Sequence, residues 1–318
     1  MRNCPICGSD RLVDERILNG YLLIRCSECS FVFADVSFDE VRRHNYHVSS
    51  STDSFYRQSQ TELDDLWFWS VACRVARKAK TGKVLDVGCG NGMLLKHFKS
   101  MGWDCFGLDV SPWAKRYAEE YGYVLYDEEI ERNYLPDNYF DLIVSTSTLE
   151  HIYDPVNHVK AMLRVLKPGG YIYVAGVPNY GSVTVRMGVS KFYLNTPPAH
   201  INYFTPLSLG NLLLKLRKYY EISFRIRTYG IPDTFYVYHR LRKFFVGGKK
   251  KSAGRGESES KKGAFPQIKE KDFRKICAGS KDRSVKIFLY KFLVLLNYFS
   301  GRPFNLGDKI EVLIRKEC

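Results

Sequence analysis

The sequence predicts an α/β fold, a doubly wound and mainly parallel sheet with helices on both faces, preceded by a small zinc-binding module. Two observations lead to this prediction. From residue 82 onward, short apolar segments typical of strands alternate with helical segments over short connections. Ahead of them, four of the nine cysteines stand together in one N-terminal block.

The N-terminal block contains two Cys-x-x-Cys pairs, Cys4 with Cys7 and Cys26 with Cys29. At this spacing, four thiolates can close a tetrahedron around zinc while the connecting residues form short strands. Four thiolates leave no coordination position for a substrate, so we expect a structural site rather than a redox pair or a catalytic zinc. We place this zinc ribbon at residues 1–38.

Residues 39–80 are predicted to form a helical connector. In segment 61–80, a threonine caps the N-terminus, and Trp67, Val71 and Val75 follow helical spacing. We expect this helix to pack in the core. The alternative is that it covers part of a ligand site on the next domain.

Residues 81–235 are predicted to form the core of the sheet. Strands are expected at 83–88, 104–110, 123–126, 140–146, 171–177 and 221–230. Helices are expected at 92–102, 112–122, 155–170 and 205–220. The C-terminal segment 284–318 adds a helix at 285–299 and a strand at 309–317, which completes a sheet of seven strands.

A basic insertion is predicted at residues 236–283. Between Arg240 and Lys286, 16 Lys and Arg stand against 5 Asp and Glu, which accounts for +11 of the net charge of +14. The remaining charge is ordinary for a soluble enzyme, so nucleic-acid binding is disfavoured. The insertion is rich in Gly, Ser and Lys, as flexible segments are. The N-terminus shows no apolar targeting segment, so we expect a cytoplasmic protein.

The helix expected at 285–299 is shorter than the ~20 residues that a membrane span needs. Together with the basic insertion, segment 240–299 could contact an anionic membrane surface peripherally. The alternative, that this helix packs on the sheet, is favoured because the fold needs a covering helix there.

The loop after the first core strand reads VLDVGCGNG at residues 84–92. Its glycines follow G-x-G-x-G instead of the G-x-G-x-x-G of dinucleotide sites. Asp86 lies on the strand just before the turn, where a buried carboxylate would repel a pyrophosphate. The same carboxylate suits S-adenosylmethionine, which carries an ammonium and a sulfonium. Asp109, at the end of the second strand, can accept bonds from ribose hydroxyls, a feature shared with NAD sites.

Five motifs in order make the sequence similar to class I S-adenosylmethionine-dependent methyltransferases over residues 82–230. They are VLDVGCGNG, GLDVSPWA, FDLIVSTSTLEHIYDP, RVLKPGGYIYVAGVPN and HINYFTPLSLGNLL. The resemblance implies a seven-stranded sheet whose last strand is antiparallel and inserted between the fifth and sixth. It also implies that Asp109 binds the ribose and that Asp127 binds the adenine amino group, although the acidic run of Asp127, Glu128 and Glu129 leaves this last position open by one or two residues. The implied cofactor-binding residues are Asp86, Gly88, Cys89, Gly90, Asp109, Val110 and Asp127.

The zinc ribbon and the stretch PAHINYFT resemble those of bacterial methyltransferases of surface-polysaccharide and sugar biosynthesis. This resemblance implies methyl transfer to a hydroxyl of a small molecule, such as a sugar or a lipid-linked sugar. A sugar C-methyltransferase is one alternative. Another is an RNA-directed methyltransferase or nucleic-acid-binding protein that uses the basic insertion, although the Asn-Pro-Pro-aromatic signature of amino-directed enzymes is absent after the fourth strand.

Methyl transfer to a hydroxyl requires removal of its proton, a task suited to histidine. His151, just past the fourth strand, and His200, on the loop after the fifth, are the candidate bases. The alternatives are packing against Glu150 for His151 and loop anchoring for His200. A divalent metal near Glu150 is disfavoured, because this motif supplies only one carboxylate. The other histidines are expected at the surface: His44, His47, His97, His158 and His239.

Overall fold

The computed structural model describes residues 3–51, 62–132, 134–182, 185, 197–229 and 307–318. The predicted basic insertion and the predicted helix 285–299 lie outside these residues. Among the helices of the described part, none is both long enough and apolar enough to cross a membrane.

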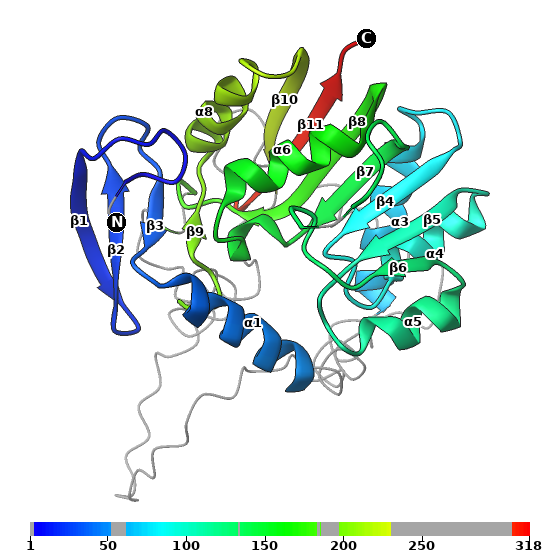
Figure 1. Cartoon of the computed structure of the whole chain (residues 1–318), viewed down its shortest axis with the longest axis horizontal. Helices are drawn as coiled ribbons and strands as arrows, with labels where there is room; N and C mark the ends of the chain where they lie inside the picture. The colour runs from blue at the N-terminus through cyan, green and yellow to red at the C-terminus, as the bar shows by residue number, and fades with distance from the viewer. Residues whose placement is uncertain (1–2, 52–61, 133, 183–184, 186–196, 230–306) are drawn as a thin grey trace, which may run out of the picture.

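The core is a seven-stranded sheet in the order β10-β11-β8-β7-β4-β5-β6 (Figure 1). Its strands are β4 (Lys83–Val87), β5 (Asp104–Leu108), β6 (Val124–Tyr126), β7 (Phe140–Thr146), β8 (Leu166–Pro178), β10 (Ile222–Tyr229) and β11 (Lys309–Lys316). Strand β11 runs antiparallel to both of its neighbours, β8 and β10, while the other pairs are parallel. The predicted position and direction of the last strand are therefore confirmed.

Helices cover both faces of this sheet. The helices are α3 (Glu62–Ala76), α4 (Met93–Ser100) and α5 (Ala114–Tyr121) on one face, and α6 (Pro155–Val165) and α8 (Pro206–Leu216) on the other. Because successive strand residues point to opposite faces, Val84 packs with α3 and α4, whereas Leu85 packs with α6 and α8. Full burial of each such side chain contributes roughly 1.5–3 kcal/mol to folding.

Helix α6 is shorter than the sequence predicts. It begins where the Asp154 side chain accepts a hydrogen bond from the Asn157 amide at 3.0 Å, and it ends at Val165 rather than at residue 170. Leu166 already pairs with Phe140 on β7. Pro168, which lacks an amide proton, cannot continue the helix, so β8 takes over these residues.

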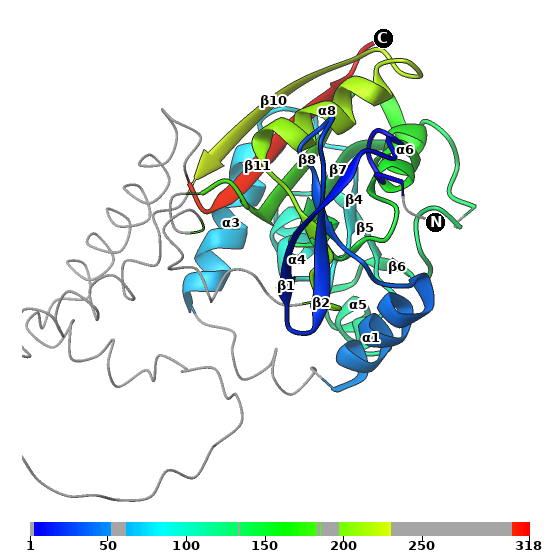
Figure 2. The ribbon, with the colours of Figure 1, turned by 90° about the vertical axis from the view of Figure 1, so that its left-hand side faces the viewer.

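The N-terminal strands form a second, smaller sheet with one strand from the core (Figure 2). The strands are β1 (Leu12–Leu18), β2 (Tyr21–Cys26), β3 (Val32–Ala34) and β9 (Asn202–Tyr203), paired in that order. The pairing of β3 with β9 was not predicted. It joins the N-terminal module to the loop that carries His200.

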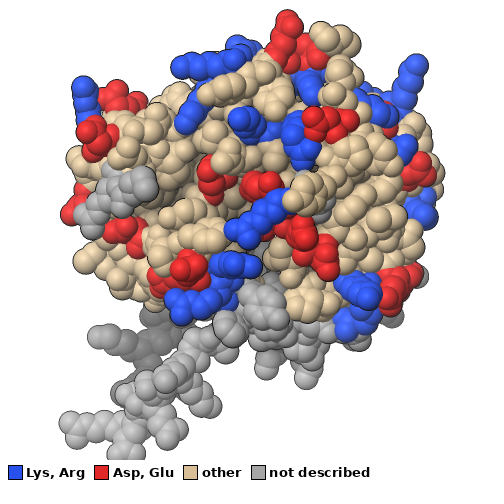
Figure 3. All heavy atoms as spheres, in the orientation of Figure 1, with Lys and Arg blue, Asp and Glu red and all other residues tan. Residues whose placement is uncertain are grey.

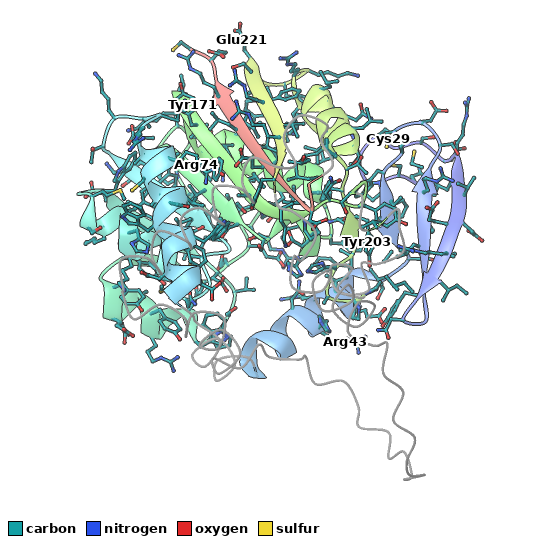
Figure 4. All side chains as sticks on the ribbon, turned by 180° about the vertical axis from the view of Figure 1, so that it is seen from behind. Cys29, Arg43, Arg74, Tyr171, Tyr203 and Glu221 are labelled. Atoms are coloured by element: carbon teal, nitrogen blue, oxygen red, sulfur yellow. The ribbon has the colours of Figure 1, made fainter. Side chains whose placement is uncertain are left out.

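Side chains reinforce this junction between the N-terminal module and the core. The rings of Phe31 and Phe204 lie 5.0 Å apart, and the Lys215 ammonium donates to the Ile6 carbonyl at 2.6 Å. Figure 4 shows Cys29 at the core-facing end of the module, with Tyr203 on β9 nearby. Helix α1 (Phe38–Ser51) follows the module and passes in front of the sheet edge formed by the carboxyl ends of the strands (Figure 1).

Candidate active site

A cavity of about 500 Å³ lies at the carboxyl ends of β4, β5 and β7. These strands are parallel, so the loops that follow them meet at one edge of the sheet. Helix α1 contributes His44 and Asn45 to the lining, and α3 contributes Asp64, Trp67 and Phe68. The predicted connector therefore does cover part of this cavity.

The glycine loop forms the floor of the cavity. Gly88 has φ of +78°, and a β-carbon there would collide with the side chain of Thr148. Gly92, with φ of +68°, is similarly crowded by Tyr123. At Gly90, with φ of +51°, the nearest atom to a β-carbon is 3.7 Å away on Trp113. This wider space leaves the Gly90 backbone accessible to a ligand.

Two carboxylates, those of Asp86 and Asp109, lie beside this loop. Asp86 is 2% exposed, and its Oδ1 has no hydrogen-bond partner. Burial, and then the charge of Asp109, raises the pKa of Asp86 to about 8. Asp109 is held by the backbone, since it accepts from the amide of Gly90 at 2.7 Å and of Ser111 at 2.8 Å. An unpartnered buried carboxylate is costly unless a cationic ligand group meets it.

Most of the predicted cofactor-binding residues line this cavity. They are Asp86, Gly88, Cys89, Gly90, Asp109 and Val110. Asp127 is not among the lining residues, whereas Glu129, Ile130 and Glu131 are. The acidic run after β6 therefore reaches the cavity at Glu129, two positions after Asp127 and within the register that the sequence left open. Contact of any of these residues with a cofactor stays a prediction.

Two histidines expected at the surface are buried. His158 is 3% exposed and lines the cavity, and its Nδ1 lies 2.8 Å from Glu131 Oε1. His97 is 9% exposed, and its Nε2 lies 3.1 Å from Asp65 Oδ1. The surface prediction was wrong for both. Helical spacing could have corrected it for His158, because this residue lies on the apolar stripe of α6 with Val159 and Met162.

The two candidate bases lie against each other. Their rings are 4.6 Å apart and nearly perpendicular. His151 lines the cavity, and its Nδ1 donates to the Ala199 carbonyl at 2.7 Å. His200 lies behind it, 9% exposed, and burial, followed by the charge of His151, lowers the pKa of His200 to about 2. Glu150, 1% exposed, has an unpartnered Oε2, and burial raises its pKa.

The four N-terminal cysteines converge in the second sheet. The sulfurs of Cys4, Cys7, Cys26 and Cys29 all lie within 4.8 Å of one another. Cys4 and Cys29 approach to 3.4 Å, and Cys7 and Cys26 to 3.5 Å. A tetrahedral zinc with bonds of about 2.3 Å requires sulfur–sulfur distances near ~3.8 Å. The donor set and its spacing thus fit zinc.

The two cysteine pairs have the same local structure. The amide of Gly8 donates to the Cys4 carbonyl at 2.8 Å, and the amide of Ser30 to the Cys26 carbonyl at 2.9 Å. Gly8 has φ of +79° and Ser30 of +58°. Matching turns of this kind present both sulfurs of a pair to one point, as a shared metal ion needs.

Comparison with known proteins assigns the family. The sequence profile of the family described as methyltransferase domain matches residues 24–216. The chain therefore belongs to the methyltransferase domain family. Its class is that of S-adenosylmethionine-dependent methyltransferases, as the glycine loop and Asp86 predict.

The sequence is also similar to ubiquinone biosynthesis O-methyltransferases. It is 34% identical to that of Methylococcus capsulatus over 98 residues, 29% of this chain and 41% of that protein. It is 29% identical to that of Ralstonia nicotianae over 147 residues, 44% of this chain and 59% of that protein. The chain thus spans about half the length of the relatives it matches.

Solved structures of methyltransferases are similar to the chain as well. A possible histamine N-methyltransferase from Thermotoga maritima has a TM-score of 0.47 at 20% identity, over 58% of this chain and 86% of that one. The plantazolicin methyltransferase in complex with S-adenosylhomocysteine has a TM-score of 0.49 at 14% identity, over 88% of this chain and 96% of that one.

Proposed function

We propose that this protein transfers a methyl group from S-adenosylmethionine to a hydroxyl of a small-molecule acceptor. The observation that carries the proposal is the buried Asp86 carboxylate at the glycine loop of the cavity, whose Oδ1 has no hydrogen-bond partner. A ligand with an ammonium group and no phosphate satisfies this carboxylate. Membership of the methyltransferase domain family supports the same ligand.

In this proposal, each lining residue contacts a different part of S-adenosylmethionine. Asp86 pairs with the ammonium of the methionine moiety, and the Gly88 to Gly90 backbone lies along that moiety. Asp109 accepts from the ribose hydroxyls, and Val110 packs on the adenine. Asp127 was predicted to bind the adenine amino group, but Glu129 lies at the cavity and is better placed to accept from it.

His151 is the residue that we propose as the proton acceptor. The bound cofactor supplies a methyl group on a positively charged sulfur. As the acceptor oxygen bonds to this methyl and the methyl–sulfur bond breaks, Nε2 of His151 takes the hydroxyl proton. Because Nδ1 donates to the Ala199 carbonyl, Nε2 carries the free lone pair. His200 is less suited to this role, since burial holds it neutral and weakly basic.

A hydroxyl acceptor is supported by the name of the related O-methyltransferases. The finer proposal, a sugar or a lipid-linked sugar, rests only on the resemblance of the cysteine module and PAHINYFT. Sugar C-methylation is the alternative within that class. We further propose that the cysteine module binds one structural zinc, which the convergence of four sulfurs supports.

An RNA acceptor has less support. Basic and acidic side chains are interspersed on the face shown in Figure 3, where phosphate binding would favour a continuous basic surface. The basic insertion that could supply such a surface lies outside the described residues. Contact of segment 240–299 with a membrane likewise stays a proposal.

Calorimetric titration with S-adenosylhomocysteine tests the cofactor site. The intact protein should bind it, and Asp109→Ala should weaken binding roughly 10- to 100-fold, because two charge-assisted hydrogen bonds are lost. Asp104→Ala is the matched control, since Asp104 lies exposed at the opposite end of the same strand and should leave affinity unchanged. No binding by the intact protein would refute the proposal.

Transfer of label from methyl-labelled S-adenosylmethionine tests the acceptor class. The panel comprises nucleotide-linked sugars, lipid-linked sugars, catechol and transfer RNA. We expect label on a hydroxyl compound and none on RNA. With that acceptor, His151→Ala should lower turnover by roughly 100-fold or more while the affinity for S-adenosylhomocysteine is kept. Unchanged turnover would remove His151 as the base.

A further inference from the structure

A second group of possible metal ligands lies beside the cavity, and one of its members, His151, lines it. Glu150, His151 and His200 each offer a ligand atom, and these atoms lie within 4.8 Å of one another. Glu150 and His151 are in the 3-10 helix η1 (Leu149–His151) after β7, while His200 precedes β9. The local motif after β7 supplies only two of the three possible metal ligands. The fold brings the third, His200, from a distant part of the chain.

Hydrogen bonds hold the two segments of this group together. The Ile201 amide donates to the Glu150 carbonyl at 3.0 Å. The Asn202 side-chain amide donates to the carbonyls of Leu149 at 3.0 Å and of Ile152 at 2.6 Å. Asn202 is 4% exposed, so these bonds are shielded from water. The three side chains are thus placed by a fixed backbone frame, as a metal site requires.

Two details of the group point to a cation. The Glu150 side chain is 1% exposed, and its Oε2 has no hydrogen-bond partner, so a cation can satisfy this buried acceptor. His151 donates Nδ1–H to the Ala199 carbonyl at 2.7 Å, which directs the lone pair of Nε2 away from that bond. Metal-binding histidines in proteins are oriented by this kind of second hydrogen bond.

We propose that Glu150, His151 and His200 bind a divalent first-row transition-metal ion at the acceptor end of the cavity. Two imidazoles and one carboxylate are a ligand set typical of such ions, and they disfavour Mg²⁺ and Ca²⁺, which take oxygen ligands. Three protein ligands leave coordination positions open. Since His151 lines the cavity, an acceptor hydroxyl can reach the ion there.

The charge of Lys309 on β11 opposes this ion. It is close enough to act on both Glu150 and His200. Burial lowers the pKa of Lys309, while the nearby Glu150 and Asp308 raise it. The Glu150 carboxylate offsets the charge of Lys309 in this group. Burial, and then the charge of Glu311, raises the pKa of the nearby Tyr229, so its phenol adds no charge to the group.

This inference rests on the proposed function and changes one role in it. With the ion bound, the acceptor hydroxyl binds to the metal and loses its proton to water. The oxygen–methyl bond then forms, the methyl–sulfur bond breaks, and sulfur keeps the electron pair. Nε2 of His151 is then a metal ligand and not the proton acceptor. Glu150 and His200 then become as necessary for methyl transfer as His151. If His151 acted alone as a base, the other two residues would not be required.

Cobalt titration of the full chain, isolated with zinc in its cysteine module, tests the proposal. We expect about one Co²⁺ per chain with visible d–d absorption from nitrogen and oxygen ligands. Glu150→Gln and His200→Asn should each weaken Co²⁺ binding at least tenfold. His97→Asn, which alters a histidine of similar burial away from the group, should bind as the intact protein does.

Three results would overturn the metal site: no Co²⁺ absorption, absorption from thiolate ligands only, or equal affinity in Glu150→Gln. Binding of S-adenosylhomocysteine by the same samples shows that each variant is folded. It also separates the two claims. Cofactor binding without Co²⁺ binding refutes the metal site alone, while Co²⁺ binding without cofactor binding refutes the proposed function.

Discussion

The buried carboxylate of Asp86 should make cofactor affinity depend on pH. Its pKa is raised to about 8 by burial and then by the charge of Asp109. Only the ionised form attracts the ammonium of S-adenosylhomocysteine. Affinity should therefore be greatest above about pH 8 and fall as the pH drops, while neutral Asp86 predominates.

The size of this effect follows from the raised pKa. Each pH unit below the pKa lowers the ionised fraction about tenfold, so roughly 1% of Asp86 is ionised two units below it. About half of Asp86 is ionised at about pH 8, so the loss of affinity between about pH 8 and about pH 6 is roughly 50-fold. Asp86→Asn should bind weakly throughout and with no such slope.

The same shift acts on folding in the opposite sense. A carboxyl whose pKa is raised on folding is most favourable when protonated, so its contribution to the free energy of unfolding falls between the ordinary carboxyl pKa and about pH 8. Without ligand, Asp86→Asn should therefore be more stable than the intact protein near pH 8. This prediction links a cost in stability to the binding role.

Calorimetric titration across this pH range, together with urea unfolding of the ligand-free protein, measures both effects. Asp104→Asn is the control for a general change in charge, because Asp104 is exposed at the far end of β5. An affinity that stays constant from about pH 6 to about pH 8, or an equal slope in Asp86→Asn, would show that Asp86 does not meet the ammonium.

Two further predictions concern the glycine loop and the cysteine module. In urea unfolding, Gly88→Ala should lose more stability than Gly90→Ala. The new methyl group collides with Thr148 only at Gly88. Both variants share the cost of a left-handed backbone, roughly 1–2 kcal/mol. Equal losses of unfolding free energy in the two variants would contradict this packing. Metal analysis should find at least one zinc per intact chain, with the same content in Cys73→Ser and about one zinc fewer, together with a lower Tm, in Cys26→Ser. An intact chain without zinc would refute the structural site.

Local patterns were sufficient to predict much of the core. The alternation of apolar segments located all seven strands of the main sheet, because each parallel strand is a short buried run bounded by a turn. The same pattern placed Asp86 in a buried position, and the structure has it 2% exposed. The strand order came instead from the family resemblance, since no local feature specifies that β11 enters between β8 and β10.

Long-range pairing is what the sequence could not show. The boundary between α6 and β8 depends on Leu166 meeting Phe140 across the sheet. Strand β9 has only two residues and exists because β3 lies beside it. Local reasoning also counted possible metal ligands within one motif only. His200, which lies near Glu150 and His151, is in a different loop that only the folded chain brings close.

The β3–β9 pairing connects the cysteine module to the acceptor end of the cavity. Asn202, which pairs with Phe33 of the module, also donates to the carbonyls on both sides of Glu150 and His151. A module that binds zinc would hold β3, and through it β9, in one position. The N-terminal sheet thus helps to hold His151 and His200, against which the acceptor must align, in position. On this argument the proposed structural zinc contributes to catalysis by fixing this loop, although it lies outside the cavity.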